Sequence, residues 1–181
     1  MRAFVGTPVP EPWIAPLVRA QGAIPGGRPV DADDLHVTLA FLDDQPEDRL
    51  DALHEALEAR PLPRAMLTPL AYAAFGQDRA RLVALDLAPD PGLAALRDRV
   101  RACARSAGID LPRARFRPHV TLLRFGATAP PDAARMPRAL AGLGTPGMPP
   151  APAASCVLWS SALTPDGPHY EALATYPLEA G

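Results

Sequence analysis

The chain has 181 residues, a formal net charge of −2 and 48% hydrophobic residues, which is typical of one sizeable globular domain or of two half-sized lobes. The slightly acidic balance argues against a general nucleic-acid coat protein. All 18 basic residues are arginine. The absence of lysine excludes a nucleotidyl-lysine ligase, a Walker-type NTPase and a lysine Schiff-base enzyme.

The first half of the chain is predicted to alternate strands and helices. We expect a strand at 2–7, a helix at 10–21, a turn-rich connection at 22–34, a strand at 35–42 and a helix at 46–60. Apolar residues recur at helical spacing of three and four on the inner face of both helices. These predicted core positions are Trp13, Leu17, Ala20, Leu50, Leu53 and Leu57.

The second half begins with two strands, at 65–75 and 80–88, joined by a turn at 76–78. A helix follows from Asp90-Pro91 to about 107, and Gly108 ends it. Its predicted inner stripe is Leu93, Leu96, Val100 and Cys103. A strand is expected at 117–125. Segment 126–154 is rich in Pro, Gly and Ala and reads as a long loop with room for a short helix at 132–141. Strands at 155–163 and 170–178, with a turn at 165–168, complete the chain.

One tetrapeptide, His-Val-Thr-Leu, occurs twice, at His36–Leu39 and His119–Leu122, 83 residues apart. Each copy is embedded in an apolar run, LHVTLAFL and RPHVTLLRF. A single such segment is most often an ordinary half-buried strand with a hydrogen-bonded histidine. Two near-identical copies in similar surroundings favour a shared function.

Strand alternation assigns the motif residues to faces. Successive side chains of a strand point to opposite sides, so His36 shares a face with Thr38, and His119 shares a face with Thr121. The opposite face of the first strand is predicted to be core, with Leu35, Val37, Leu39 and Phe41. A nucleic-acid base could stack on Phe41, but its parity places it in the core.

The element order predicts an α+β protein built by duplication. We expect residues 1–181 to form a single domain of two pseudo-symmetric lobes, each contributing one motif strand to a central cleft. Two facing strands of this kind would hold two imidazoles around one small anionic group.

Hydrolysis of a phosphodiester without metal needs a base, an acid and donors to the phosphoryl oxygens. Imidazole suits both proton transfers because its unperturbed pKa is about 6.5. The threonine hydroxyls could donate to the phosphate, and symmetry leaves the roles of the two histidines open. We expect His54 and His169 to be surface, boundary or rim residues.

Arginines cluster near the second motif and on the preceding helix. Arg113, Arg115, Arg117 and Arg124 surround His119 and are as compatible with phosphate binding as with scattered surface charge. Strict alternation would place Arg124 on the face opposite His119. For the helix we expect a solvated face, with Arg97, Arg99, Arg101 and Arg105.

The cysteines and the N-terminus give expectations about compartment and metals. Cys103 and Cys156 lie in apolar segments and read as small buried residues, and no spacing favours a disulfide. The sequence has no Cys-x-x-Cys or His-Glu-x-x-His spacing, so we expect no metal and no cofactor. It also has no apolar stretch of membrane-spanning length and no secretory h-region, so a cytoplasmic protein is expected.

The sequence resembles the 2H phosphoesterase superfamily, in which paired His-x-Thr-x motifs define the site, and within it the RNA 2′,3′-cyclic phosphodiesterase branch, historically labelled 2′-5′ RNA ligase. The resemblance lies in MRAFVG, DADDLHVTLAFL, RFRPHVTLLRF and SSALTPDGPHYEALATYPL. It implies a bilobal fold and a metal-independent reaction that leaves a 2′-phosphate. It also implies that His36 donates a proton, that His119 accepts one, and that Thr38, Thr121 and Arg124 bind phosphate.

The resemblance implies that the partners are RNA 3′ ends or nucleotides bearing a 2′,3′-cyclic phosphate, and we expect a monomer. Three alternatives stay open: hydrolysis of small cyclic nucleotides of the ADP-ribose cyclic phosphate type, a 2′-5′ joining side activity, and non-catalytic binding of RNA ends. Relatives often continue the first motif as Phe-Leu-Gly, whereas this chain has Phe-Leu-Asp43-Asp44. That difference and segment 126–154 leave substrate size and base preference open.

Overall fold

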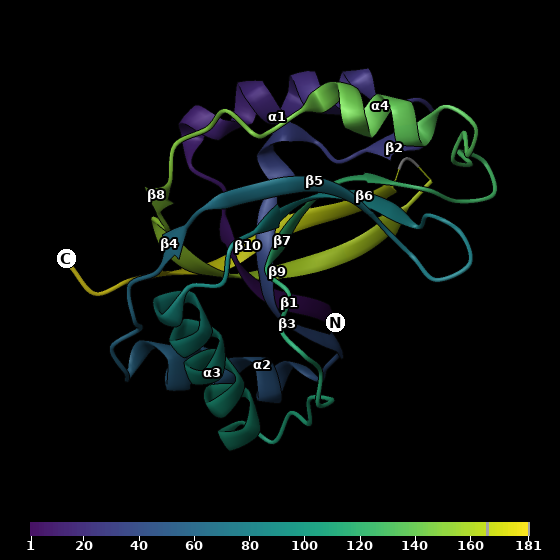
Figure 1. Ribbon diagram of the computed structural model, residues 1–181. Coiled ribbons are helices and arrows are strands. Elements are labelled where there is room, and N and C mark those ends of the chain that lie inside the picture. The colour runs from purple at the N-terminus through teal and green to yellow at the C-terminus, as the bar shows by residue number, and fades with distance from the viewer. Residues whose placement is uncertain (166, 181) are drawn as a thin grey trace.

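The computed structural model, which describes residues 1–165 and 167–180, is an α+β fold centred on one antiparallel sheet (Figure 1). Within the described residues the sheet has eight strands. Seven follow the order β10-β9-β1-β3-β7-β6-β5, and β2 pairs with β7. Their bounds are β1 Arg2–Pro8, β2 Arg28–Pro29, β3 His36–Asp44, β5 Pro69–Phe75, β6 Leu82–Leu87, β7 His119–Arg124, β9 Ser155–Thr164 and β10 Gly167–Pro177.

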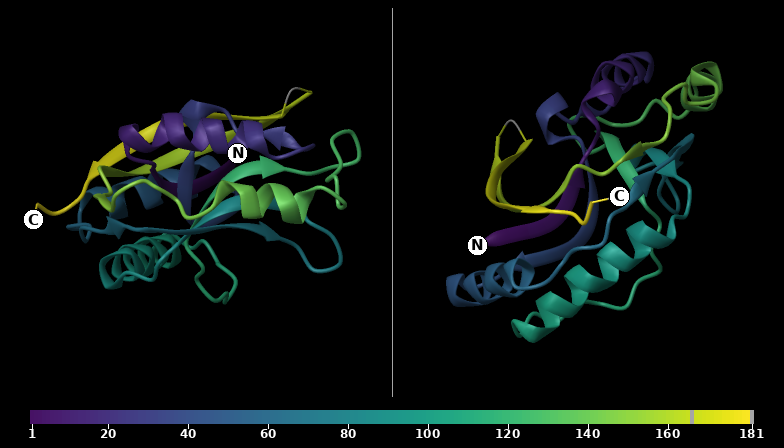
Figure 2. Two further views of the ribbon diagram at one scale, coloured as in Figure 1. Left: turned by 45° about the horizontal axis from the view of Figure 1, so that its top comes forward. Right: turned by 90° about the vertical axis from the view of Figure 1, so that its left-hand side faces the viewer.

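Helices cover the sheet in two groups. The helical segments are α1 Glu11–Ala23, the short η1 Ala32–Asp34, α2 Glu47–Glu58, α3 Pro91–Ser106 and α4 Met136–Leu143. Helices α1 and α4 lie along the top of the view in Figure 1, and α2 and α3 lie below the sheet. Figure 2 shows the same separation from two further sides. A small ribbon, β4 Met66–Leu67 with β8 Ala151–Pro152, connects distant parts of the chain.

The chain traces the same pattern twice, which confirms the predicted duplication. The first half runs β1-α1-β3-α2-β5 and the second runs β6-α3-β7-α4-β9. In the sheet, β3 and β7 lie side by side at the centre, with β1 and β6 outside them. The last strand of each half pairs with the first strand of the other, since β5 adjoins β6 and β9 adjoins β1. The two halves therefore meet in one continuous sheet.

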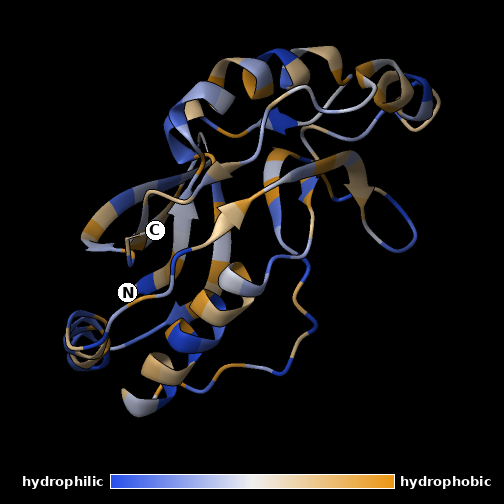
Figure 3. Ribbon diagram, turned by 60° about the vertical axis from the view of Figure 1, so that its left-hand side comes forward, coloured by the Kyte–Doolittle hydropathy of each residue, from blue (hydrophilic) through white to orange (hydrophobic). Residues whose placement is uncertain are grey.

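The core matches the predicted apolar stripes. Every inner position predicted for the three long helices is buried, from Trp13 to Cys103. Cys103 and Cys156 are both buried and both free. Figure 3 shows hydrophobic segments on the central strands and a hydrophilic tip on the β5–β6 hairpin. The helix expected at 132–141 lies at Met136–Leu143, and the loop around it also contributes β8. Of the turn predicted at 165–168, position 166 lies outside the described residues.

The arginines of α3 lie at least partly exposed on the surface of the helix, and two of them also bond to a neighbouring segment of the chain. Arg97 donates to the carbonyl of Ala114 at 3.0 Å, and Arg101 donates to the carbonyl of Pro112 at 2.7 Å. Both acceptors lie in segment 109–118, which has no regular structure and leads into β7. These bonds fasten that segment to the helix. Within the described part of the chain, none of the helices has both the length and the hydropathy needed to cross a bilayer.

Candidate active site

The two motif strands are neighbours at the centre of the sheet. β3 pairs antiparallel with β7, and Val37 is the register partner of Val120. Continuing this register places His36 and Thr38 on the same face as His119, with the two histidines diagonal to each other. Diagonal residues of an antiparallel pair are about 7–8 Å apart. The structure thus brings together motif residues that are distant in sequence.

His36 is held by two hydrogen bonds within its own segment. Its Nδ1 lies 2.6 Å from the carbonyl oxygen of Asp34, and its Nε2 lies 3.1 Å from Oγ1 of Thr38. A carbonyl can only accept, so Nδ1 donates and Nε2 of the neutral ring accepts from the threonine hydroxyl. The lone pair of Nε2 therefore faces the same side of the strand as Thr38.

Aromatic rings surround the His36 imidazole. The ring of Phe4 stacks on it at 4.7 Å between centroids, and the rings of Trp159 and Tyr170 lie at 5.4 and 5.6 Å. These residues come from β1, β9 and β10, so three strands of the sheet enclose one histidine. Such a wall removes water from the ring and disfavours its charged form.

The pKa of His36 follows from this enclosure. Burial lowers the pKa of His36 to about 4, against its hydrogen bond to the Asp34 carbonyl, which raises it. The positive charge of Arg124 lowers it further, and a proton on His119 would act in the same direction. Both groups are therefore near enough to act electrostatically on His36. In the free protein at neutral pH, His36 is uncharged.

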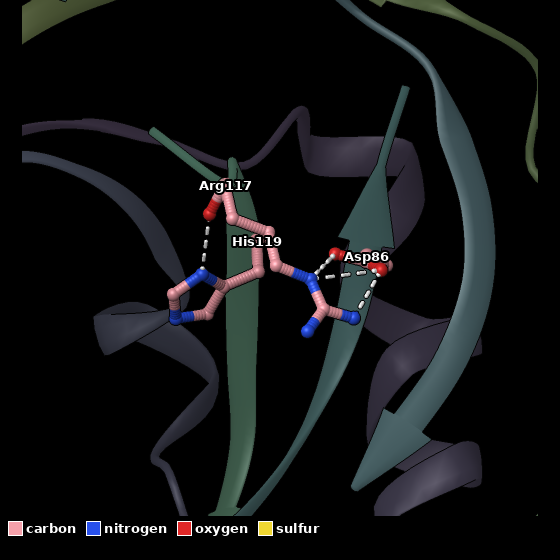
Figure 4. A network of polar contacts seen from close by, with 3 residues as sticks. All are labelled: Asp86, Arg117 and His119. Carbon is pink, nitrogen blue, oxygen red and sulfur yellow. Dashed lines mark hydrogen bonds and ion pairs between the residues drawn. The ribbon is translucent and has the colours of Figure 1, made fainter. Parts of the chain in front are cut away.

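His119 has the same attachment but a more open environment. Its Nδ1 lies 2.8 Å from the carbonyl oxygen of Arg117, again two residues upstream (Figure 4). Its ring lies against Phe75, with centroids 4.8 Å apart. Within the described residues, no hydrogen bond engages His119 Nε2. Both histidines thus adopt the Nδ1–H tautomer and present Nε2.

A β-bulge follows each motif and reverses the strand alternation. In β3, Val5 pairs with Ala40 and Gly6 pairs with Thr38, so Leu39 is the extra residue. In β7 the same position, Leu122, is extra, between the partners of Val83 and Ala84. Two consecutive buried residues follow each threonine, Leu39 with Ala40 and Leu122 with Leu123. A bulge re-aims every side chain beyond it.

The bulges correct two expectations from strict alternation. Phe41 is not a core residue: it is 60% exposed and lies beyond the bulge on the side of the strand that carries His36. Arg124 likewise comes to the face of His119, where its charge reaches His36. The two residues occupy equivalent positions in the repeats, three residues after each threonine.

Two cavities share Arg124 and Tyr170 in their walls. One, of about 360 Å³, also includes the carboxylates of Asp31 and Asp34. The other, of about 280 Å³, includes the exposed ring of Phe41. As far as the described residues define them, neither cavity is lined by a motif histidine. His36 lies beside both cavities, because its ring contacts Tyr170, which lines both of them.

The remaining residues singled out from the sequence lie elsewhere. Arg113 and Arg115 are exposed, and Arg117 pairs with Asp86. His54 is a boundary residue, as predicted: its Nδ1 lies 2.9 Å from the hydroxyl of Tyr176. His169 is exposed. In residues 1–165 and 167–180, no group of three or more His, Cys, Asp or Glu side chains is arranged to hold a metal ion.

The sequence analysis missed the aromatic enclosure. Phe4 is indistinguishable from a core residue in an apolar strand, and Trp159 and Tyr170 lie more than 120 residues from His36 along the chain. The only local signal is Tyr170, which adjoins the predicted rim residue His169.

Comparisons with known proteins agree with this geometry. Residues 8–144 match the family model described as the 2′-5′ RNA ligase superfamily. An RNA 2′,3′-cyclic phosphodiesterase of Thermus thermophilus is 34% identical over 194 residues, spanning 98% of this chain and 90% of that protein. One of Escherichia coli is 37% identical over 104 residues, 57% of this chain and 58% of that protein.

The fold comparison covers nearly the whole chain. The crystal structure of Escherichia coli LigT complexed with 3′-AMP matches with a TM-score of 0.81 and 25% sequence identity, over 99% of this chain and 98% of that chain. The family match, the sequence relatives and the duplicated sheet with its paired motif strands agree. The chain belongs to the 2′-5′ RNA ligase superfamily of 2H phosphoesterases.

Proposed function

We propose that this protein hydrolyses 2′,3′-cyclic phosphodiesters at RNA 3′ ends to 2′-phosphomonoesters without a metal ion. The observation that carries the proposal is the pairing of β3 with β7, which sets two Nδ1-anchored imidazoles on one face of the sheet. The relatives named RNA 2′,3′-cyclic phosphodiesterase support the choice of reaction.

In the proposed reaction the cyclic phosphate lies between His36 and His119. Water attacks phosphorus while Nε2 of His119 accepts one of its protons. The bond between phosphorus and the 3′-oxygen breaks, and protonated His36 gives its proton to that oxygen. One P–O bond forms and one breaks, which leaves the phosphate on the 2′-oxygen. Exchange with solvent restores both rings.

In this scheme, binding of the substrate phosphate favours protonation of His36, which then acts as the acid. Free His36 is neutral because burial and nearby positive charge lower its pKa to about 4. An anionic phosphate between the histidines offsets the positive charge of Arg124 and favours the imidazolium of His36. Protonation of His36 is thereby coupled to substrate binding. Thr38, Thr121 and Arg124 donate hydrogen bonds to the non-bridging oxygens.

The substrate class follows from the same surface. LigT of Escherichia coli has been crystallised with 3′-AMP, ATP and NADP⁺, so a related protein accommodates nucleotides. In this chain the two cavities that share Arg124 and Tyr170 provide room beside His36 for a terminal nucleoside and its neighbour. An RNA end uses both cavities, whereas a small cyclic nucleotide uses one.

The test is a product assay by ³¹P NMR on an oligoribonucleotide with a 2′,3′-cyclic end, on a cyclic mononucleotide and on ADP-ribose cyclic phosphate. We expect a 2′-monoester, unchanged turnover in EDTA, a bell-shaped pH dependence and the highest kcat/KM on the oligonucleotide. A 3′-monoester would contradict the assignment of His36 as donor to the 3′-oxygen. A higher kcat/KM on either small substrate would assign the protein to the small-nucleotide reaction. Binding of the RNA end without hydrolysis would leave a non-catalytic role.

A further inference from the structure

The side chain of Arg117 is fixed by a bidentate ion pair. Its Nε and Nη2 donate to the carboxylate of Asp86 at 2.6–3.2 Å (Figure 4). The carboxylate is well shielded, since the Asp86 side chain is 15% exposed against 57% for Arg117. Bidentate geometry and partial burial make such a pair stronger and more directional than an ordinary surface pair.

The same guanidinium is linked to His119 by a second route. It lies over the ring of Phe75, with its central carbon 3.9 Å from the ring centroid. Phe75 in turn contacts the His119 ring at 4.8 Å. In addition, Asp86 is the register partner of His119 across β6 and β7. The four residues thus form a closed set in which Arg117 reaches His119 through its own carbonyl and through Phe75.

The main chain before the motif histidine is held differently in the two repeats. At the equivalent position of the first repeat, the carbonyl that accepts from Nδ1 of His36 belongs to Asp34, the last residue of η1, whose amide donates to the carbonyl of Asp31 just before η1. Arg117 instead lies in the irregular segment 109–118, one residue before its end. The next residue, Pro118, has no N–H to donate to the ladder. The carbonyl of Pro118 accepts from the amide of Leu87 at 3.0 Å, so the main chain is held on one side of Arg117, and the ion pair of its side chain holds it at Arg117 itself.

We propose that Asp86, Arg117 and Phe75 act together as positioning residues for His119. Asp86 fixes the guanidinium and Phe75 supports it from the side of the imidazole. The carbonyl of Arg117 then holds Nδ1–H and leaves Nε2 turned toward the attacking water. None of the three side chains transfers a proton. Naming His119 as the base depends on the proposed function, but the orientation of its ring does not.

The experiment separates these two claims by combining ¹⁵N NMR of the ligand-free imidazoles with kinetics on a cyclic-ended oligoribonucleotide. The variants are Asp86→Asn and Arg117→Met; the second alters a side chain that is 57% exposed, and circular dichroism checks that both variants fold. Asp98→Asn is the matched control, because Asp98 pairs with Arg97 on α3 at 3.9 Å. Asp86→Glu tests rescue by a carboxylate.

We expect His119 to be the Nδ1–H tautomer in the wild type and in Asp98→Asn, and a mixture of tautomers in Asp86→Asn and Arg117→Met. We expect kcat to fall about 10–100-fold in those two variants with little change in KM, because a misdirected catalytic group loses rate rather than affinity. Asp86→Glu should recover part of the loss.

A wild-type His119 tautomer together with wild-type kcat in both variants would overturn the proposal, as would an equal loss in Asp98→Asn. If the wild type fails to hydrolyse the cyclic end, the proposed function fails, and the NMR comparison still decides whether Asp86 and Arg117 orient the ring.

Discussion

The side-chain amide of Gln21 donates a hydrogen bond of 2.9 Å to the main-chain carbonyl of Leu122, the residue that bulges from β7. The amide of Val30 donates to the same carbonyl, also at 2.9 Å, and Gln21 donates at 2.8 Å to the carbonyl of Val30. A carbonyl displaced from the β6–β7 register is thus satisfied from α1 and from the segment after β2. Gln21, which is buried, holds the bulge that turns Arg124 onto the site face.

Replacing Gln21 with Leu should therefore affect both stability and the site. The change leaves a buried carbonyl without one donor, which costs about 1–3 kcal/mol of unfolding free energy. Arg124 then loses its fixed direction, so kcat/KM should also fall. Urea unfolding and hydrolysis of a cyclic-ended oligonucleotide measure the two effects.

Gln45→Leu is the control for this change, because Gln45 donates to the carbonyl of Leu42 at a second bulge in β3. It should lower stability and leave Arg124 in place. An unchanged free energy of unfolding in Gln21→Leu would contradict the role given to that amide.

Removing either motif imidazole should abolish turnover without unfolding the protein. We expect His36→Ala and His119→Ala each to lower kcat by about 10²–10⁴-fold, the usual contribution of a general acid or base. His54→Ala is the control, since His54 lies on α2 and its ring contacts Tyr176 rather than the motif residues. Circular dichroism checks the fold. Turnover near that of the wild type in either site variant would exclude the two-histidine mechanism.

The stability of the protein should depend on pH through His36. Its pKa is lowered from about 6.5 in the unfolded chain to about 4 in the fold, so the unfolded chain binds the proton more readily. The contribution of neutral His36 to the free energy of unfolding is therefore complete above pH 6.5. It decreases by up to about 3 kcal/mol as the pH falls toward 4. His36→Gln cannot take up this proton. We expect its unfolding free energy to decline less between pH 7 and pH 4.5, and a parallel decline would contradict the assignment.

Arg124 should set part of the pKa of His36. Because its positive charge lowers that pKa, Arg124→Gln should raise it, by less than the whole shift, since burial is the larger cause. Inorganic phosphate bound to the wild type should raise the same pKa by about 1–3 units. NMR titration of the His36 ring with and without phosphate measures both effects. If the pKa of His36 is the same with and without phosphate, the anion does not bind beside His36.

Truncation of Leu39 should cost much more stability than truncation of Phe41. Leu39 is buried, so Leu39→Ala should cost about 2–5 kcal/mol of unfolding free energy. Phe41→Ala should cost less than about 1 kcal/mol, because the ring is 60% exposed, although it should weaken substrate binding if a base stacks there. Chemical unfolding and KM measurements compare the two. A large loss of stability in Phe41→Ala would contradict its exposed position and indicate that the ring packs in the core.

Periodicity predicted the helices and most strands because each signal is local. Trp13 in α1 and Leu53 in α2 are each followed four residues later by another apolar residue, and both are buried. The paired tetrapeptides likewise identified the histidines that the sheet brings together. The same local logic failed after Leu39 and Leu122, because a bulge depends on the partner strand. An apolar pair such as Leu122-Leu123 fits either a bulge or regular alternation.

The order of the strands in the sheet could not be predicted from the sequence for a related reason. Nothing near Asp86 indicates that its carboxylate meets Arg117, because the contact exists only once β6 lies beside β7. The aromatic wall around His36 needs β1, β9 and β10 assembled together. Residues that tune a catalytic group come from distant parts of the chain, and one sequence without its sheet order does not pair them.

The reciprocal exchange of β5 and β9 makes the two halves mutually dependent. Cutting the chain in the β5–β6 turn would give two fragments, each owning a single imidazole and an unsatisfied strand edge. Neither fragment could act alone, and reassembly in a mixture would have to precede any turnover. Activity regained on mixing would thus report docking of the halves, in the same way that a dimeric enzyme reports association when its active site spans two subunits.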